Sequence, residues 1–184
     1  MISFNKKFIF IHPGKCGGST IKREFLDLSR KYKFDTLHRQ KHKPLDFFIN
    51  LIQSNNQDPA DFYKFSIVRN PWDRAVSWYY HWHLVHRRDQ SYIPFDRWLK
   101  TRGTNLRFRD IEKMDYVLKL EDLDAGLSHV LKKLNIPQIK VTQHITYNTQ
   151  RPTQKHYSEY YDDETQHIVE DLYSDMIEKF QYTF

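Results

Sequence analysis

The chain of 184 residues contains a single cysteine, Cys16, which excludes a disulfide scaffold and any zinc cluster built from cysteine ligands. No apolar run approaches the roughly 20 residues that a membrane-spanning helix needs, and the N-terminus lacks the apolar core of a signal peptide. Internal repeats and low-complexity tracts are also absent. We therefore expect one globular domain over residues 1–184, without a membrane span and located in the cytoplasm.

Charge is distributed unevenly along the chain. Residues 1–109 hold 21 Lys and Arg against 9 Asp and Glu, whereas residues 110–184 hold 8 against 14. A basic N-terminal portion indicates a partner that carries phosphate or sulfate, and nucleic acid is one such partner. A solvated lysine-rich surface explains the charge equally well, so the motifs must decide between the two.

Short apolar runs alternate with helical patterns. Three runs are typical of buried parallel strands: residues 8–12, 62–68 and 116–120. Helices are predicted from near Ser19, after Pro44, and from Pro71 with Asn70 as N-cap. A further helix has its apolar face between Leu123 and Leu134, and the last helix has Asp162, Asp163 and Glu164 in its first turn. Strands that alternate with helices predict an α/β fold with a central parallel sheet flanked by helices.

A glycine-rich segment connects the first predicted strand to the helix after it: His12-Pro13-Gly14-Lys15-Cys16-Gly17-Gly18-Ser19-Thr20. Its glycines let backbone N–H groups approach an anion, the helix N-terminus offers unpaired N–H groups, and Lys15 adds a full charge. The segment is not a Walker A loop, because Lys15 precedes the last two glycines instead of following them. It predicts a site for a phosphate-like group, with a tight glycine turn and an incidental lysine as the alternative.

A second polar motif follows the second predicted strand: Val68-Arg69-Asn70-Pro71-Trp72-Asp73-Arg74-Ala75-Val76-Ser77. Ser77 comes about two helical turns after Arg69. Both can therefore face one point beyond the carboxyl ends of the strands, where open α/β sheets bind ligands. A guanidinium fork and a hydroxyl suit a terminal phosphate. Alternatively, Arg69 forms an ion pair with Asp73, and Ser77 is an ordinary helix residue.

These segments resemble the nucleotide motifs of sulfotransferases that use 3′-phosphoadenosine 5′-phosphosulfate (PAPS). Residues 15–20 are similar to the 5′-phosphosulfate loop, P-K-[TC]-[GA]-G-T-S, and residues 68–77 to the 3′-phosphate motif, nearly residue for residue. Residues 115–123 and 172–184 fit as well, so the resemblance spans nearly the whole chain. The most similar branch contains carbohydrate sulfotransferases of the heparan and chondroitin types, with small bacterial relatives. Without the anchor of Golgi members, the chain resembles a bacterial or viral enzyme.

The sequence departs from the family pattern at two places. The family usually has proline directly before the lysine, whereas here Pro13 is displaced and Gly14 takes that position. Ser19-Thr20 inverts the usual Thr-Ser order, which leaves both hydroxyl groups available.

The resemblance implies a single P-loop-like domain that transfers the sulfuryl group of PAPS to an acceptor hydroxyl. The product of the donor would be adenosine 3′,5′-bisphosphate (PAP), and no metal is required. Lys15 and the loop amides would hold the 5′-phosphosulfate, and Arg69 with Ser77 would hold the 3′-phosphate. Arg151 and Lys155 lie where relatives often close over the nucleotide. The expected cofactor-binding residues are Lys15, Cys16, Gly17, Gly18, Ser19, Thr20, Arg69, Ser77, Arg151 and Lys155.

A histidine is the expected general base. Heparan-type relatives place a catalytic histidine between the two nucleotide motifs, and here that interval contains His38 and His42. Imidazole suits proton transfer because its ordinary pKa lies near 6.5. We favour His42, which precedes the helix after Pro44, and keep His38 as the alternative. Lys15 would stabilise charge on the leaving oxygen, so His42, Lys15 and His38 form the expected catalytic set.

Other functions stay open at this level. A nucleotide-dependent phosphotransferase should need Mg²⁺ and prefer ATP, but its Walker A loop is missing. A non-enzymatic protein that binds polyanions or nucleic acid should show steep salt dependence, but no nucleic-acid-binding fold is recognisable. A PAPS-binding protein without catalytic activity is a further alternative. We expect the acceptor to be a hydroxyl compound, in this branch a glycan, and we expect no nucleic-acid partner; the sequence does not indicate an oligomeric state.

Overall fold

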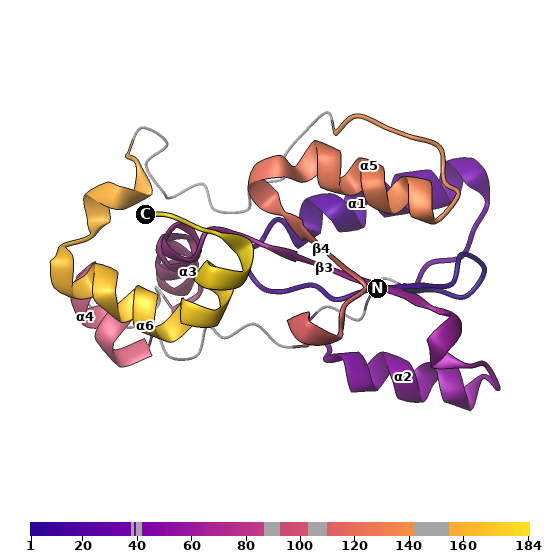
Figure 1. Cartoon of the computed structure of the whole chain (residues 1–184), viewed down its shortest axis with the longest axis horizontal. Helices are drawn as coiled ribbons and strands as arrows, with labels where there is room; N and C mark the ends of the chain where they lie inside the picture. Colours follow the sequence, from indigo (N-terminus) through magenta and orange to yellow (C-terminus); the bar gives the residue numbers. More distant parts are fainter. Residues whose placement is uncertain (38, 40–41, 87–92, 103–109, 142–154) are drawn as a thin grey trace. The chain divides into compact units, whose positions relative to one another are not determined.

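The computed structural model describes residues 1–37, 39, 42–86, 93–102, 110–141 and 155–184. The chain forms two compact units (Figure 1). Residues 1–68 and 108–145 belong to the first unit, and residues 69–107 and 146–184 belong to the second. This division does not test whether residues 1–184 act as one domain, which stays a prediction.

A four-stranded sheet lies at the centre of the first unit. In their order across the sheet, the strands are β1 (Ile2–Ser3), β2 (Phe8–Phe10), β3 (Tyr63–Val68) and β4 (Tyr116–Lys119). β2, β3 and β4 run parallel, whereas β1 pairs with β2 in the antiparallel direction. The predicted α/β fold with a central, mostly parallel sheet is therefore confirmed. The two-residue β1 is too short to leave a periodic signal in the sequence, and it was not expected.

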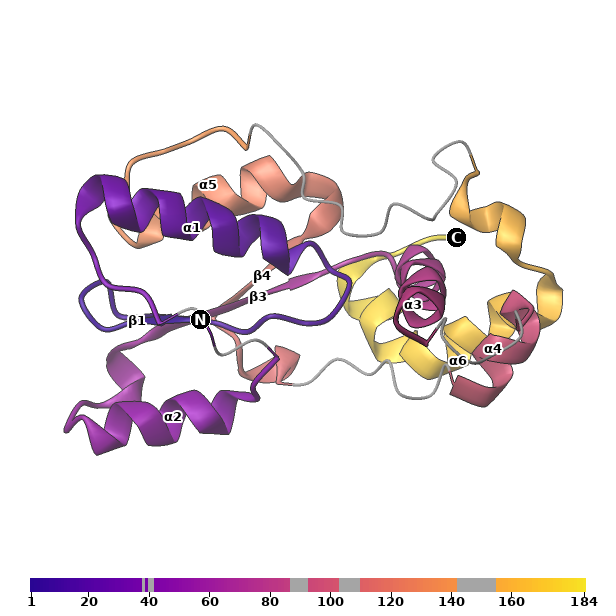
Figure 2. The ribbon, with the colours of Figure 1, turned by 180° about the vertical axis from the view of Figure 1, so that it is seen from behind.

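Helices cover both faces of this sheet. α1 (Gly18–Tyr32) and α5 (Leu123–Lys133) lie on one face, and α2 (Leu45–Ser54) lies on the other (Figures 1 and 2). Because successive side chains of a strand point to opposite faces, Phe8 and Phe10 pack in the core beneath α1 and α5, whereas Ile9 packs beneath α2. Three short 3₁₀ helices complete the described part of this unit: η1 (Pro59–Asp61), η3 (Ile111–Lys113) and η4 (Leu120–Asp122).

The second unit is helical in its described residues. Its elements are α3 (Pro71–His86), α4 (Phe95–Arg102), η5 (Tyr157–Tyr160) and α6 (Asp163–Phe180). α3 contacts the other three, and its Trp72 and Tyr79 are buried. The prediction that Asn70 is the N-cap of α3 is confirmed, because its Oδ1 accepts a hydrogen bond from the Asp73 N–H at 3.1 Å. The sequence reasoning missed α4, although its apolar residues recur at helical spacing.

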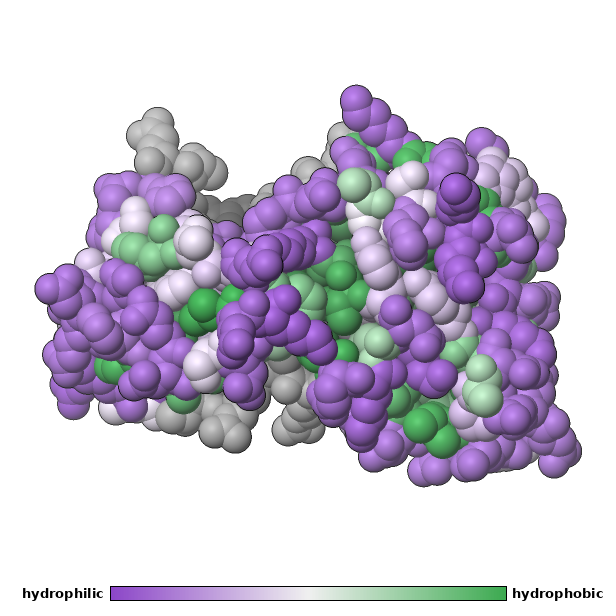
Figure 3. Space-filling model, in the orientation of Figure 1, coloured by the Kyte–Doolittle hydropathy of each residue, from purple (hydrophilic) through white to green (hydrophobic). Residues whose placement is uncertain are grey.

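Hydrophilic residues cover most of the face drawn in Figure 3, and hydrophobic residues appear there in smaller areas. Among the helices that the structure describes, none combines the length and the apolar character that crossing a membrane requires.

Candidate functional site

The candidate phosphate loop begins where β2 leaves the sheet. The Ile11 N–H donates to the Phe65 carbonyl at 2.9 Å, and the buried Ser66 hydroxyl donates to the Ile11 carbonyl at 3.1 Å. β3 therefore still holds the chain at residue 11. His12 comes next and precedes Pro13, and a residue before proline is restricted to extended backbone conformations. The chain thus turns into the loop from a fixed starting point.

The loop adopts a backbone conformation that suits an anion. Lys15 and Gly17 both have left-handed backbones, with φ of 64° and 74°. Gly17 is the N-cap of α1 and supplies no side-chain cap. The first N–H groups of a helix have no partner within the helix, so such an N-terminus can bind an anion. The combination of this terminus with the lysine fits a phosphate-like group.

The other candidate residues of the loop differ in how deeply their side chains are buried. Cys16 is fully buried in the core, and its thiol contacts the Gly14 carbonyl at 3.5 Å. Its side chain therefore cannot reach an anion, and only its backbone could contribute. Thr20 is buried, with 2% of its surface exposed, whereas Ser19 is half-buried.

Two histidine side chains meet beside the loop. The His42 ring lies 4.7 Å from the His12 ring, centroid to centroid. His42 is exposed, and its Nδ1 lies 2.9 Å from the His12 carbonyl oxygen. Because a carbonyl oxygen only accepts, Nδ1 carries the proton of the neutral ring and Nε2 is left as the basic nitrogen. Geometry thus brings the favoured base close to the loop, while His38 lies outside the described residues.

The turn that carries His42 is held from its other side as well. Pro44 is the N-cap of α2 and offers no side-chain hydrogen bond, but the Asp110 carboxylate accepts from the Leu45 N–H at 3.0 Å. Asp110 therefore caps α2 from a distant part of the sequence. His42 itself has a left-handed backbone with φ of 57°. Such a conformation costs free energy in a residue other than glycine, and it persists where neighbours enforce it.

The second nucleotide motif belongs to the second unit. The Arg69 guanidinium donates to one carboxylate oxygen of Asp73 from Nε at 2.8 Å and from Nη2 at 2.5 Å. This ion pair is the one that the sequence offered as an alternative role for Arg69. It does not exclude a phosphate site, because the guanidinium keeps its positive charge in the ion pair. Ser77 lies on α3 and is buried.

Lys155, one of the two weaker nucleotide candidates, lies elsewhere in the second unit. The Lys155 ammonium lies 4.2 Å from the centre of the Tyr160 ring, a distance typical of a cation–π interaction. Arg151 lies outside the described residues. Its expected contact with the nucleotide therefore stays a prediction.

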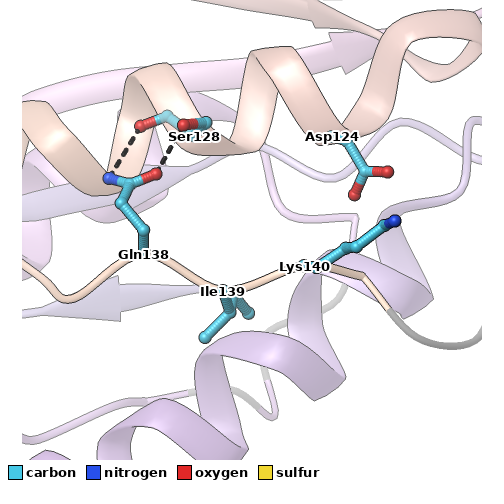
Figure 4. Close-up of a pocket in the computed structure, with 5 residues that line it drawn as sticks. All are labelled: Asp124, Ser128, Gln138, Ile139 and Lys140. Atoms are coloured by element: carbon cyan, nitrogen blue, oxygen red, sulfur yellow. Dashed lines mark hydrogen bonds between the residues drawn. The ribbon is translucent and has the colours of Figure 1, made fainter.

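A surface hollow of about 510 Å³ lies between α5 and the segment after it (Figure 4). It is lined by Asp124, Ser128, Gln138, Ile139 and Lys140. The Ser128 hydroxyl donates to Gln138 Oε1 at 2.5 Å, and Asp124 accepts from the Val141 N–H at 3.0 Å. These bonds fasten the segment to α5, and none of the lining residues is a candidate from the sequence.

His12 is the site residue that sequence reasoning missed. It was counted as the end of a strand and as the first residue of the glycine-rich segment, and no role was assigned to its side chain. Among the residues that the structure describes, no group of three or more histidine, cysteine or acidic side chains could hold a metal ion.

Comparison with known proteins gives a match to a family model. Residues 1–183 fit the model of the sulfotransferase family, so the match includes both candidate motifs, residues 12–20 and 68–77. No curated protein matches the chain.

Proposed function

The chain belongs to the sulfotransferase family, and we propose that it transfers the sulfuryl group of PAPS to a hydroxyl group of a carbohydrate acceptor. The family supports sulfuryl transfer in general. The donor, the acceptor and the base are our proposals, as is the action of residues 1–184 as one domain. The observation that supports the donor and the base most is the loop at the N-terminus of α1, which has left-handed backbones at Lys15 and Gly17 and two histidine rings beside it.

PAPS would supply a sulfuryl group joined to a phosphate leaving group. Lys15 and the backbone N–H groups of Gly17, Gly18 and Ser19 would hold the 5′ end and balance the negative charge that grows on the leaving oxygen. Arg69 and Ser77 would bind the 3′-phosphate, which ordinary adenine nucleotides lack. The Arg69–Asp73 ion pair orients the guanidinium over the first turn of α3 before any ligand binds.

His42 would act as the base at Nε2. The acceptor oxygen forms its bond to sulfur while the bond between sulfur and the phosphate oxygen breaks, and the hydroxyl proton passes to Nε2. The Nδ1–H bond to the His12 carbonyl then stabilises the imidazolium that forms. The choice of Nε2 over Nδ1 as the basic nitrogen follows from hydrogen-bond chemistry, because the carbonyl oxygen can accept only from a protonated Nδ1.

Calorimetric titration with PAP, AMP and ATP tests the nucleotide site. We expect PAP to bind more tightly than AMP, and Arg69→Ala to weaken PAP about 10- to 150-fold, the value of one charged hydrogen-bonding group. Arg97→Ala is the matched control, because Arg97 is an exposed arginine of α4 in the same unit. If PAP binds no better than AMP, the two-motif interpretation is wrong. Preferential binding of ATP with Mg²⁺ would favour a phosphotransferase instead.

Transfer of label from radioactive PAPS to a panel of carbohydrates tests the acceptor and the base. His42→Gln should lower turnover about 10²- to 10⁴-fold with any acceptor that wild type modifies, the usual contribution of a general base. Binding of PAP should be unchanged in this variant. Equal turnover in the variant and in wild type would remove His42 from the mechanism.

A further inference from the structure

The base and the phosphate loop share one neighbour, His12. We infer that His12 is a positioning residue for His42, and that Gly18 of the loop makes the room that this role needs. The inference rests on the proposed function, since it takes His42 as the base. It concerns an indirect role, because only 9% of the surface of His12 is exposed, whereas His42 is open to solvent.

The first part of the role belongs to the backbone of His12. Its carbonyl oxygen holds His42 Nδ1 at 2.9 Å and so selects the tautomer with a basic Nε2. Pro13 restricts His12 to extended conformations and thereby limits the directions in which this carbonyl can point. Pro13, whose position departs from the family pattern, therefore helps to fix the carbonyl that binds His42.

The second part belongs to the ring of His12, which other groups confine on three sides. The Phe10 ring stacks with it at 5.8 Å and 22°, and the His42 ring lies against it at 4.7 Å. Gly18 closes the third side: a Cβ atom there would lie 2.1 Å from Cδ2 and 2.4 Å from Nε2 of His12. The ring thus fills the space where any other residue would carry its side chain.

This arrangement connects the base to the loop. Gly18 is the first residue of α1, so its backbone belongs to the helix terminus that would bind the anion. The same residue contacts the His12 ring, and that ring contacts His42. A shift of the loop therefore moves the surface against which the base packs.

Imidazole nitrogen NMR tests the inference without an acceptor. Protein labelled with ¹⁵N in histidine is measured at about pH 8.5, well above the ordinary imidazole pKa, and His42 is assigned from the signals that His42→Gln removes. We expect wild type to show His42 as a single Nδ1–H tautomer. His12→Ala keeps the carbonyl but removes the ring that packs His42 against it, so it should give a mixture of tautomers. His12→Phe, which keeps an aromatic ring, should restore the single tautomer.

His129→Ala is the matched control. Its ring stacks on Tyr116 at 4.2 Å, at the amino end of β4, so this variant also removes a histidine ring from a stack in the first unit. It should leave the His42 signals unchanged. If His12→Ala does not fold, Gly18→Ala replaces it, because the added Cβ displaces the ring without removing it.

A kinetic measurement uses PAPS with water as the acceptor and follows the release of PAP. His12→Ala should lower kcat about 10- to 100-fold, part of what a general base contributes, with KM for PAPS little changed. An Nε2–H tautomer in wild type, or an unchanged tautomer in His12→Ala, would overturn the inference, as would loss of the single tautomer in His12→Phe. Titration with PAP reports on the proposed function alone, so the two can fail separately.

Discussion

Replacing Gly18 by alanine puts a methyl group where the His12 ring lies. The new Cβ would be 2.1 Å from Cδ2 of that ring, whereas carbon atoms pack at about 3.5–4.0 Å. The ring cannot easily give way, because the Phe10 ring stacks with it at 5.8 Å and the His42 ring lies at 4.7 Å. Overpacking of this kind costs about 1–3 kcal/mol, and the helix propensity of alanine over glycine offsets at most about 1 kcal/mol.

We therefore expect Gly18→Ala to lower the free energy of unfolding by about 1–2 kcal/mol, a fall in melting temperature of about 2–8 °C for a chain of this size. Urea and thermal unfolding followed by circular dichroism measure both quantities. The double variant Gly18→Ala with His12→Ala should be more stable than the sum of the two single effects predicts, by about 1 kcal/mol, because the methyl group then occupies the vacated space.

Gly17→Ala is the control for this cycle. Its Cβ would meet Leu120 at 2.4 Å, and its φ of 74° is unfavourable for alanine, so it should also destabilise the protein. His12→Ala should not relieve that loss, because the clash involves another side chain. If Gly18→Ala unfolds like wild type, or if its effect and that of His12→Ala simply add, the contact between Gly18 and His12 does not exist in solution and the reasoning fails.

Three further predictions concern the frame around the site. Asp110→Ala should cost about 1 kcal/mol in urea unfolding, because it removes the cap of α2, and Lys113→Ala, which removes only the ion pair of Asp110, should cost less. The pKa of Tyr63 is raised from 10.0 to about 12, mainly by burial and to a smaller extent by the negative charge of Asp115. The neutral phenol therefore stabilises the fold below pH 10, and this contribution is lost as the pH rises through about 12. Tyr63→Phe should accordingly stay folded to higher pH, as circular dichroism will show. Hydrogen bonds from Thr165 hold the pKa of Asp162, the N-cap of α6, below its ordinary 3.8. Asp162→Ala should lower the melting temperature at neutral pH, and the difference from wild type should shrink as the pH falls below 3.8.

Local sequence signals predicted most of the fold. The strand expected at 62–68 begins one residue later, at Tyr63, and β2 ends at Phe10, within the run expected at 8–12. These runs were visible because parallel strands are apolar on both faces. The start of α3 was equally visible, since an N-cap followed by proline is a local signal that needs no tertiary contact.

The rest depended on contacts between distant residues. Asp110 caps α2 across 65 positions, and no spacing rule connects a carboxylate with a helix that far away. No role was predicted for the His12 side chain, because its relation to Gly18 exists only after the chain turns at Pro13. His42 was selected from its interval between two motifs, but the tautomer that suits it as a base follows from a carbonyl that only the fold supplies.

The two adjacent glycines show most clearly what a motif leaves out. The sequence argument explained both by the approach of an anion to the backbone. In the structure Gly17 is needed for its left-handed φ and for the Leu120 side chain packed against it, whereas Gly18 has no positive φ and is needed for the His12 ring. The requirement at position 18 therefore comes from His12, the neighbour of the proposed base, as much as from the proposed phosphate loop. A substitution there should disturb proton transfer even where the anion still binds, which a substitution at position 17 should not do.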